Sequence, residues 1–286
     1  MSKSLTIDVV YDYVNTNKDE LLAKAVTGFK TIDYVSVQTG VLAPTAIHVL
    51  DTNVTFGDGS VCGFTDTVQQ TISARMIDPR HIKVNAHWCQ ADFYDTWANQ
   101  LAHIGADKQE LPFAPMFCDE IIKDIQKKLE KEFWSQIINI ATADVPAENK
   151  LTATGVLADD VEAIIKKIPA EIIENAVVFM GQEDFMKLVF EYQHANHYIH
   201  PITGDKNFEL TVPGTMIKVI GVPGLNGTGR IFAGDPKNFV FGTDFRNDKE
   251  VFDFWYSKDD DEYKFKCTFS AGEQIAFPSQ VIMMTN

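Results

Sequence analysis

The chain has 286 residues, of which 45% are hydrophobic and 11% aromatic, and it carries a formal net charge of −15. This composition excludes a mainly disordered chain and provides enough apolar surface for a sizeable core. The acidic balance argues against a general nucleic-acid-binding protein, because such a protein needs a basic surface to displace counterions.

Membrane and export patterns are not apparent in the sequence. Its apolar runs fall short of the roughly eighteen residues of a membrane span, and its first residues lack the apolar core of a signal peptide. We therefore expect synthesis in a cytoplasm. The four cysteines stand at positions 62, 89, 118 and 267 without a CxxC pair, which is typical of free thiols rather than of a zinc site.

The first fifty residues are expected to form an arm with little core of its own. Residues 19–26 have the pattern of a short helix, with Asn17 at its start and Gly28 near its end. Residues 37–51 contain a glycine and a proline and are expected to be irregular. An ordinary N-terminal subdomain is the alternative interpretation.

Two polar-leaning strands are predicted next, at residues 67–75 and 81–89. The sequence Asp78-Pro79-Arg80 between them is typical of a turn, so the two strands are expected to pair as a hairpin. Neither face of the first strand is strongly apolar in the sequence. Such a pair is expected to project from the body of the chain and to find its partner on another molecule.

A long helix is predicted over residues 115–141. Pro115 suits its first turn, and Ile122 and Ile140 widen an apolar stripe. At 1.5 Å per residue the helix would be about 35–40 Å long. The stripe itself recurs every four residues, at Ile121, Ile125, Leu129, Phe133 and Ile137.

An α/β unit is expected from about residue 145 to 245, with helices at 159–168 and 183–192 and a buried strand at 176–180. The glycine-rich segment 221–230 lacks the order of a phosphate-binding loop and is followed by a strand. We therefore expect it to be a mobile or tight turn between two strands.

The end of the chain is predicted to be sheet. Residues 251–256 and 263–269 alternate apolar and polar side chains and are separated by a solvated turn, which predicts a hairpin. After a turn at residues 271–273, a further strand is expected at 274–277.

Three histidines, His194, His197 and His200, are spaced three apart and could ligate a metal if they lay on one helix. However, Pro201 disfavours helix at the residue before it, and the sequence contains no HExxH motif. A polar loop with exposed histidines is the favoured interpretation, so we expect no catalytic, cofactor-binding or metal site.

The order of arm, hairpin, long helix, α/β unit and terminal sheet resembles the major capsid protein of tailed bacteriophages. The most specific matching stretch is the glycine-rich loop at 224–233, followed by Phe239-Val240-Phe241-Gly242-Thr243-Asp244. The closing sheet of residues 251–256, 264–269 and 272–278 follows it. Leu111-Pro112-Phe113, which leads into the long helix, is a weaker match.

The resemblance implies an α+β fold, the phage major-capsid-protein fold, with four parts. These would be an N-terminal arm at residues 1–50, an extended E-loop at 51–93, a peripheral (P) domain at 94–149 and 246–286 with its spine helix at 115–141, and an axial (A) domain at 150–245.

The function implied by the resemblance is structural rather than enzymatic, and it requires no cofactor. Copies of the chain would assemble into pentamers and hexamers that form the icosahedral shell around the double-stranded DNA of a tailed phage. The shell would enclose DNA without sequence-specific binding, contact scaffolding, portal and decoration proteins but no membrane, and be built in the bacterial host cytoplasm. The alternatives are an encapsulin-type cargo shell and a metal-dependent enzyme that uses His194, His197 and His200.

Overall fold

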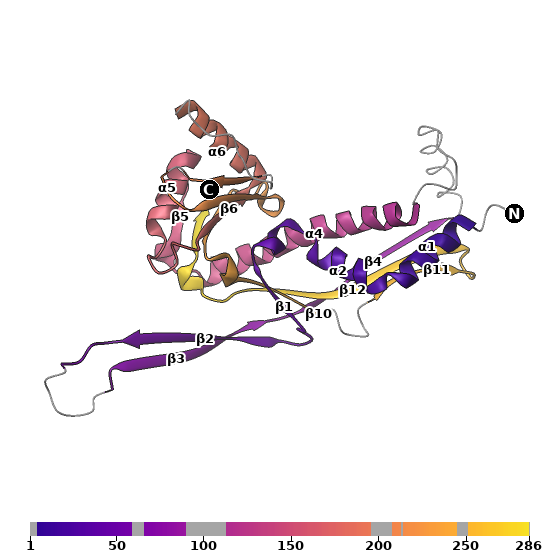
Figure 1. The fold of residues 1–286 in the computed structure, drawn as a ribbon, viewed down its shortest axis with the longest axis horizontal. Coiled ribbons are helices and arrows are strands. Elements are labelled where there is room, and N and C mark those ends of the chain that lie inside the picture. The colour runs from indigo at the N-terminus through magenta and orange to yellow at the C-terminus, as the bar shows by residue number, and fades with distance from the viewer. Residues whose placement is uncertain are drawn as a thin grey trace.

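The computed structural model describes residues 5–58, 66–89, 113–195, 208–212, 214–244 and 251–285. Figure 1 shows an elongated body along one long helix, an α/β unit at one end of that helix, and a thin two-stranded hairpin that extends away from both. No described helix is both long and apolar enough to cross a membrane.

The long helix, α4 (Phe113–Asp144), has 32 residues and is therefore about 48 Å long. It extends beyond both predicted ends. The predicted stripe is confirmed as buried at four of its five positions, while Ile121 is half-buried. The buried apolar side chains of α4 are Cys118, Ile122, Ile125, Leu129, Phe133, Trp134, Ile137 and Ala141.

The N-terminal segment packs along this helix. It consists of α1 (Leu5–Thr16), α2 (Lys18–Thr27) and the 3-10 turn η1 (Lys30–Asp33), and residues from Val10 to Val35 share one core with α4. The expectation of an arm with little core is therefore wrong for this part. The side chain of Asn17 donates to Tyr13 O at 2.9 Å and does not cap α2.

A five-stranded sheet covers the other side of this core. Its centre is the 14-residue strand β12, which pairs with β4 along one edge and with β11 and then β10 along the other. The predicted terminal hairpin is confirmed, but the predicted break at residues 271–273 is wrong, because β12 continues through it. The strands are β1 (Ser36–Thr39), β4 (Arg80–Cys89), β10 (Phe239–Asp244), β11 (Val251–Ser257) and β12 (Glu262–Ile275).

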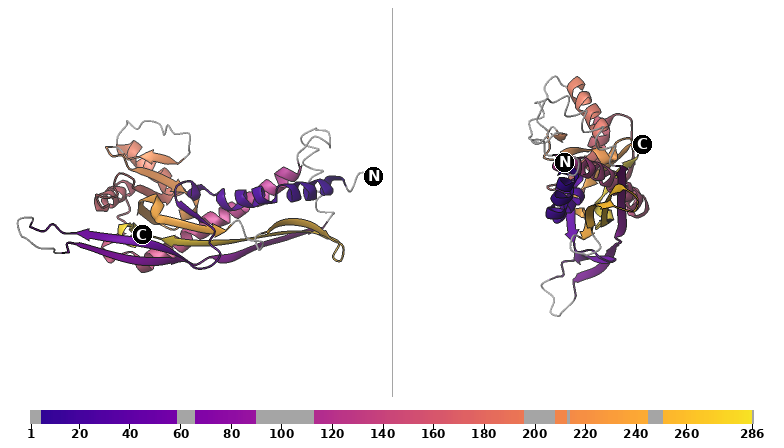
Figure 2. Two further views of the ribbon diagram at one scale, coloured as in Figure 1. Left: turned by 60° about the horizontal axis from the view of Figure 1, so that its bottom comes forward. Right: turned by 90° about the vertical axis from the view of Figure 1, so that its right-hand side faces the viewer.

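The projecting hairpin is formed by β2 (Thr45–Val54) and β3 (Val68–Ile77), which pair antiparallel over their whole length. Residues 37–51 are thus not irregular, and residues 67–75 and 81–89 do not pair with each other. The chain bends after β3, and β4 enters the five-stranded sheet instead. Figure 2 shows β3 and β4 following one another along the same side of the molecule.

The α/β unit contains a six-stranded mixed sheet, against which α5 (Leu157–Lys167) and α6 (Gln182–Ala195) pack. Both predicted helices, the buried strand and the tight glycine-rich turn are confirmed. The sheet order is β5 (Lys150–Thr152), β13 (Ile282–Thr285), β9 (Arg230–Gly234), β6 (Val177–Gly181), β8 (Lys218–Val222) and β7 (Glu209–Thr211).

Two strands lie in a different sheet from the one expected. β13 at the end of the chain joins the α/β sheet between β5 and β9, although residues 246–286 were expected in the other sheet. Conversely, β10 lies in the five-stranded sheet, although residues 150–245 were expected in the α/β unit. Four short 3-10 turns connect the remaining elements: η2 (Ala147–Asn149), η3 (Pro223–Leu225), η4 (Pro236–Asn238) and η5 (Pro278–Gln280).

Candidate functional site

The projecting hairpin presents an apolar face that its own chain leaves exposed. The register places Leu50 opposite Ile72 and Val54 opposite Val68, and cross-strand partners share a face. All four side chains are exposed, Ile72 to 73%. Neither face of β3 alone is strongly apolar, as expected from its sequence. The pairing with β2 adds Leu50 and Val54 to the face of Val68 and Ile72, with the polar pair Thr52 and Gln70 between them.

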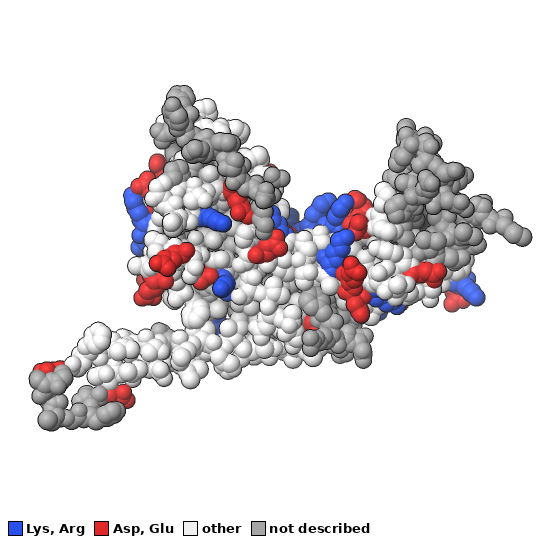
Figure 3. Space-filling model, in the orientation of Figure 1, with Lys and Arg blue, Asp and Glu red and all other residues white. Residues whose placement is uncertain are grey.

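The opposite face of the hairpin is polar beyond its first few residues. Asn53 is opposite Gln69, and Thr71 and Ser73 follow on the same face. Figure 3 shows that the visible face of the stem carries almost no charge. The apolar face on the other side of the hairpin is, in contrast, typical of a surface that is buried against another molecule.

The start of the hairpin is held firmly against the body. We call residues 75–80, where β3 ends and β4 begins, the root. Ile77 is fully buried there in a small core with Val41, Val240 and Ala276. A Cβ atom on either Gly242 or Gly272 would lie 2.9 Å from Ile77 Cγ2, so these glycines make room for the root.

Two arginines add polar contacts at the root. Arg75 contacts Asp144 at the end of α4 and donates to Gln274 Oε1 at 3.1 Å. Arg80 donates to Glu132 Oε1 at 2.8 Å and to Glu273 Oε2 at 3.1 Å. The hairpin is thus anchored to both α4 and β12.

A buried carboxyl group ties the N-terminal segment to α4. Glu130 accepts from Thr31 N at 2.9 Å and from the Thr31 hydroxyl, which itself accepts from Trp134 Nε1 at 2.8 Å. Burial raises the pKa of Glu130, and hydrogen bonds from Thr31 and from the Gly224 amide oppose that rise. Glu130 was not among the residues singled out from the sequence. The pattern that could have indicated it is a glutamate four residues before a tryptophan, directly beside the apolar stripe.

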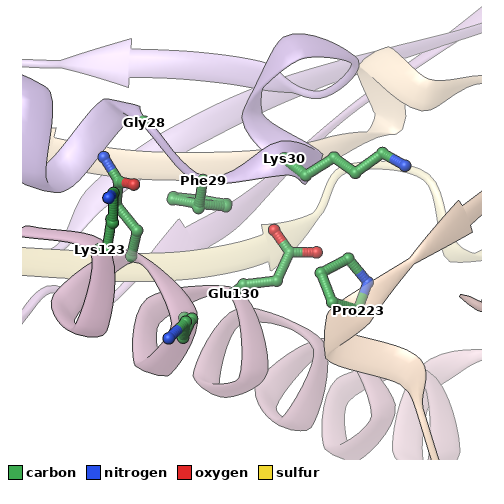
Figure 4. Close-up of a pocket in the computed structure, with 8 residues that line it drawn as sticks. Gly28, Phe29, Lys30, Lys123, Glu130 and Pro223 are labelled. Atoms are coloured by element: carbon green, nitrogen blue, oxygen red, sulfur yellow. The ribbon is translucent and has the colours of Figure 1, made fainter. Parts of the chain in front are cut away.

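The same region contains a small cavity of about 210 Å³, between α4, the segment 28–30 and Pro223. Figure 4 shows the side chain of Glu130 between Phe29 and Pro223, with Lys30 above it. Lys30 Nζ donates to Gly221 O at 2.8 Å and lies 5.0 Å from the centre of the Phe208 ring. Since both Lys30 and Glu130 are engaged within the chain, we interpret the cavity as a packing seam rather than a ligand site.

Replacing Gly224 by alanine is expected to disrupt this seam. The added Cβ atom would lie 2.4 Å from Trp134 Cδ1 and 2.5 Å from the backbone oxygen of Glu130. We expect urea unfolding of the purified chain to show a loss of about 1–3 kcal/mol or more. Gly57→Ala, where the nearest atom is 3.4 Å away, should change stability by less than about 0.5 kcal/mol; equal losses would contradict the close packing.

The structure describes one of the three spaced histidines. His194 lies exposed in the last turn of α6, whereas His197 and His200 fall outside the described residues. Within the described ranges, no group of three or more His, Cys, Asp or Glu side chains is placed to hold a metal ion. Cys89, Cys118 and Cys267 form no disulfide within the described part; Cys62 lies outside it.

Comparisons with known proteins identify the fold. No family model matches the sequence, and no curated protein is similar to it in sequence. Solved structures are similar over most of their length. A satellite phage P4 procapsid has a TM-score of 0.63 and 10% identity, and the match covers 99% of this chain and 97% of that chain. The capsid of an empty GTA particle has a TM-score of 0.60 and 10% identity, and the match covers 91% of this chain and 89% of that chain. A virus-like particle from Pyrococcus furiosus is also similar, with a TM-score of 0.50 and 10% identity over 96% of this chain and 99% of that chain.

Proposed function

We propose that this chain, which has the α+β fold of phage major capsid proteins, is a shell-forming protein. Copies would assemble into pentamers and hexamers that build an icosahedral capsid around the double-stranded DNA of a tailed phage. The observation that carries the proposal is the exposed apolar face of the hairpin, which a neighbouring copy would cover.

The physical argument is one of unburied surface. Leu50, Val54, Val68 and Ile72 are each more than 40% exposed on one face of a two-stranded ribbon, and an isolated ribbon of this kind has marginal stability in water. Covering that face on a second copy removes apolar surface from water. Because the hairpin of one copy contacts a different surface of the next, the contact is heterologous and can close into rings.

The remaining features are compatible with this function. A net charge of −15 suits a shell that encloses DNA without gripping it. We also propose the domain map of arm, E-loop, P domain and A domain, with the E-loop at residues 45–77 rather than 51–93. Contacts with scaffolding, portal and decoration proteins are part of the proposal.

A second candidate is a cargo shell of the encapsulin type. The similarity to the Pyrococcus furiosus virus-like particle supports it. The contents of particles purified from the natural source distinguish the two: packaged double-stranded DNA supports the phage capsid, and enclosed protein supports the cargo shell.

The direct test is to concentrate the purified chain and to examine it by analytical ultracentrifugation and negative-stain electron microscopy. We expect closed particles of uniform size. A protein that stays monomeric and folded at high concentration, over a range of salt and pH, and with a scaffolding protein added, would contradict the proposal.

A matched pair of substitutions tests the hairpin face. Ile72 on the apolar face and Ser73 on the polar face are neighbours, and both are exposed in the subunit. Ile72→Asp is expected to prevent particle formation, since it would place a charge in the buried contact. Ser73→Asp should leave assembly intact. If light scattering records the same assembly for both variants, the apolar face is not the contact.

A further inference from the structure

The root of the hairpin contains a buried carboxyl group that is only partly satisfied. The side chain of Glu273 on β12 is 3% exposed, and its Oε2 accepts from Arg80 Nη2 at 3.1 Å. Its Oε1 is buried and has no hydrogen-bond partner among the described residues. A buried polar atom without a partner is costly, and more so when the group is charged.

The charged groups that act on Glu273 come from two neighbouring elements. Arg80 from β4 donates to it, and Glu132 from α4 shares the same guanidinium. One arginine therefore bridges a buried and a half-exposed carboxylate. On the other edge of β12, Phe241 of β10 is the apolar residue opposite Glu273.

Gln274, the next residue of β12, makes a second set of polar contacts with the root. Gln274 accepts from Arg75 of β3 and donates to Met76 O at 2.7 Å, and Arg75 also contacts Asp144 of α4. Both positions lie directly under the bend between β3 and β4. A Cβ atom on Gly272 would lie 2.9 Å from Asp78 O, so the bend sits closely on the strand.

We propose that Glu273 is a positioning residue that couples the seating of the hairpin root on β12 to the binding of a proton. With a neutral carboxyl group the root stays seated on β12 and α4. With a carboxylate the root opens more often, because opening lets the buried oxygen reach water. Proton uptake thereby reduces the motion of the whole projecting hairpin relative to the body of the chain.

The direction of the pH dependence follows from linkage. Burial raises the pKa of Glu273 from 4.5 to about 7; Arg80 opposes this rise and Glu132 adds to it. The seated root thus binds the proton more tightly than the open root. Seating is strongest below pH 4.5, weakens as the pH rises from 4.5 to about 7, and is constant above that. Within this window the ratio of seated to open root changes by at most about tenfold per pH unit.

Hydrogen–deuterium exchange of the unassembled full chain, read by mass spectrometry between pH 5.5 and 8, tests the proposal. After correction for the intrinsic exchange rate, protection of peptides covering residues 76–82 should fall by roughly tenfold or more in the wild type. In Glu273→Gln, which is neutral throughout, it should change less than about twofold.

Two controls keep the result unambiguous. Asp144→Asn weakens the other anchor, so it should lower protection equally at every pH and keep the wild-type slope. Peptides from the middle of α4 should show no pH-dependent difference between wild type and Glu273→Gln, since this opening is local. An identical pH slope in wild type and Glu273→Gln would overturn the proposal. Because the measurement uses single subunits, its outcome is independent of whether the chain forms shells.

Discussion

A chain in which residues 50–72 are replaced by an Asn-Gly turn is expected to remain folded and to lose shell formation completely. Val49 and Ser73 are paired in the register of β2 and β3, and a two-residue Asn-Gly turn closes such an antiparallel pair. The root keeps Ile77, Arg75 and Arg80 and therefore its contacts with the body. Only the part that projects away from the subunit is removed.

The assay compares particle yield by electron microscopy with the thermal unfolding of the subunit. We expect no particles and a melting temperature within a few degrees of the wild-type value. Removing residues 56–90 instead, as the strand pattern of the sequence suggests, would delete β4 from its ladder with β12 and unfold the sheet. Normal particles from the shortened hairpin would show that assembly uses a different surface.

Replacing Leu129 by alanine is expected to cause a large loss of subunit stability. Its side chain is 4% exposed and lies in the core between α4 and the five-stranded sheet. Removing three carbon atoms from a packed site costs both transfer free energy and a residual cavity, in total about 2–5 kcal/mol. Urea unfolding of the unassembled subunit measures this loss.

Lys127 provides the matched control on the same helix. Its side chain is 74% exposed and pairs only with Asp124, at 3.1 Å, among the contacts of the described residues. Lys127→Ala should cost less than about 0.5 kcal/mol, because exposed ion pairs contribute little. Similar losses for the two variants would contradict the orientation of α4. If Lys127→Ala impairs assembly without changing stability, this face of α4 contacts a neighbouring copy.

The elements predicted correctly are those whose signal lies in consecutive residues. The apolar stripe of α4 persists over several turns, and the alternation of residues 263–269 marks β12. Both patterns depend only on the geometry of one element. The polar network at the root was not predictable in this way, since Arg75, Arg80 and Glu273 meet through a bend and a long sequence separation.

The pairing of β3 was wrong for a related reason. Asp78-Pro79-Arg80 has turn composition, and the simplest interpretation of two strands around a turn is a hairpin. The chain instead bends there, and β3 pairs antiparallel with the preceding strand, β2, across a connection of more than ten residues. Pro44 directly precedes the true partner, β2, and favoured an irregular assignment. Strand partners are a property of the whole sheet rather than of the local pattern.

The position of β13 affects how the newly made chain can fold. Ile282–Thr285 lies between β5 and β9, so the α/β sheet lacks an inner strand until residues 282–285 have been synthesised. The other sheet likewise joins β1 near the beginning of the chain to β10. Such pairings over long sequence separations form slowly. Neither sheet can be completed before these later strands have been translated, which leaves incomplete sheet edges open to aggregation until then.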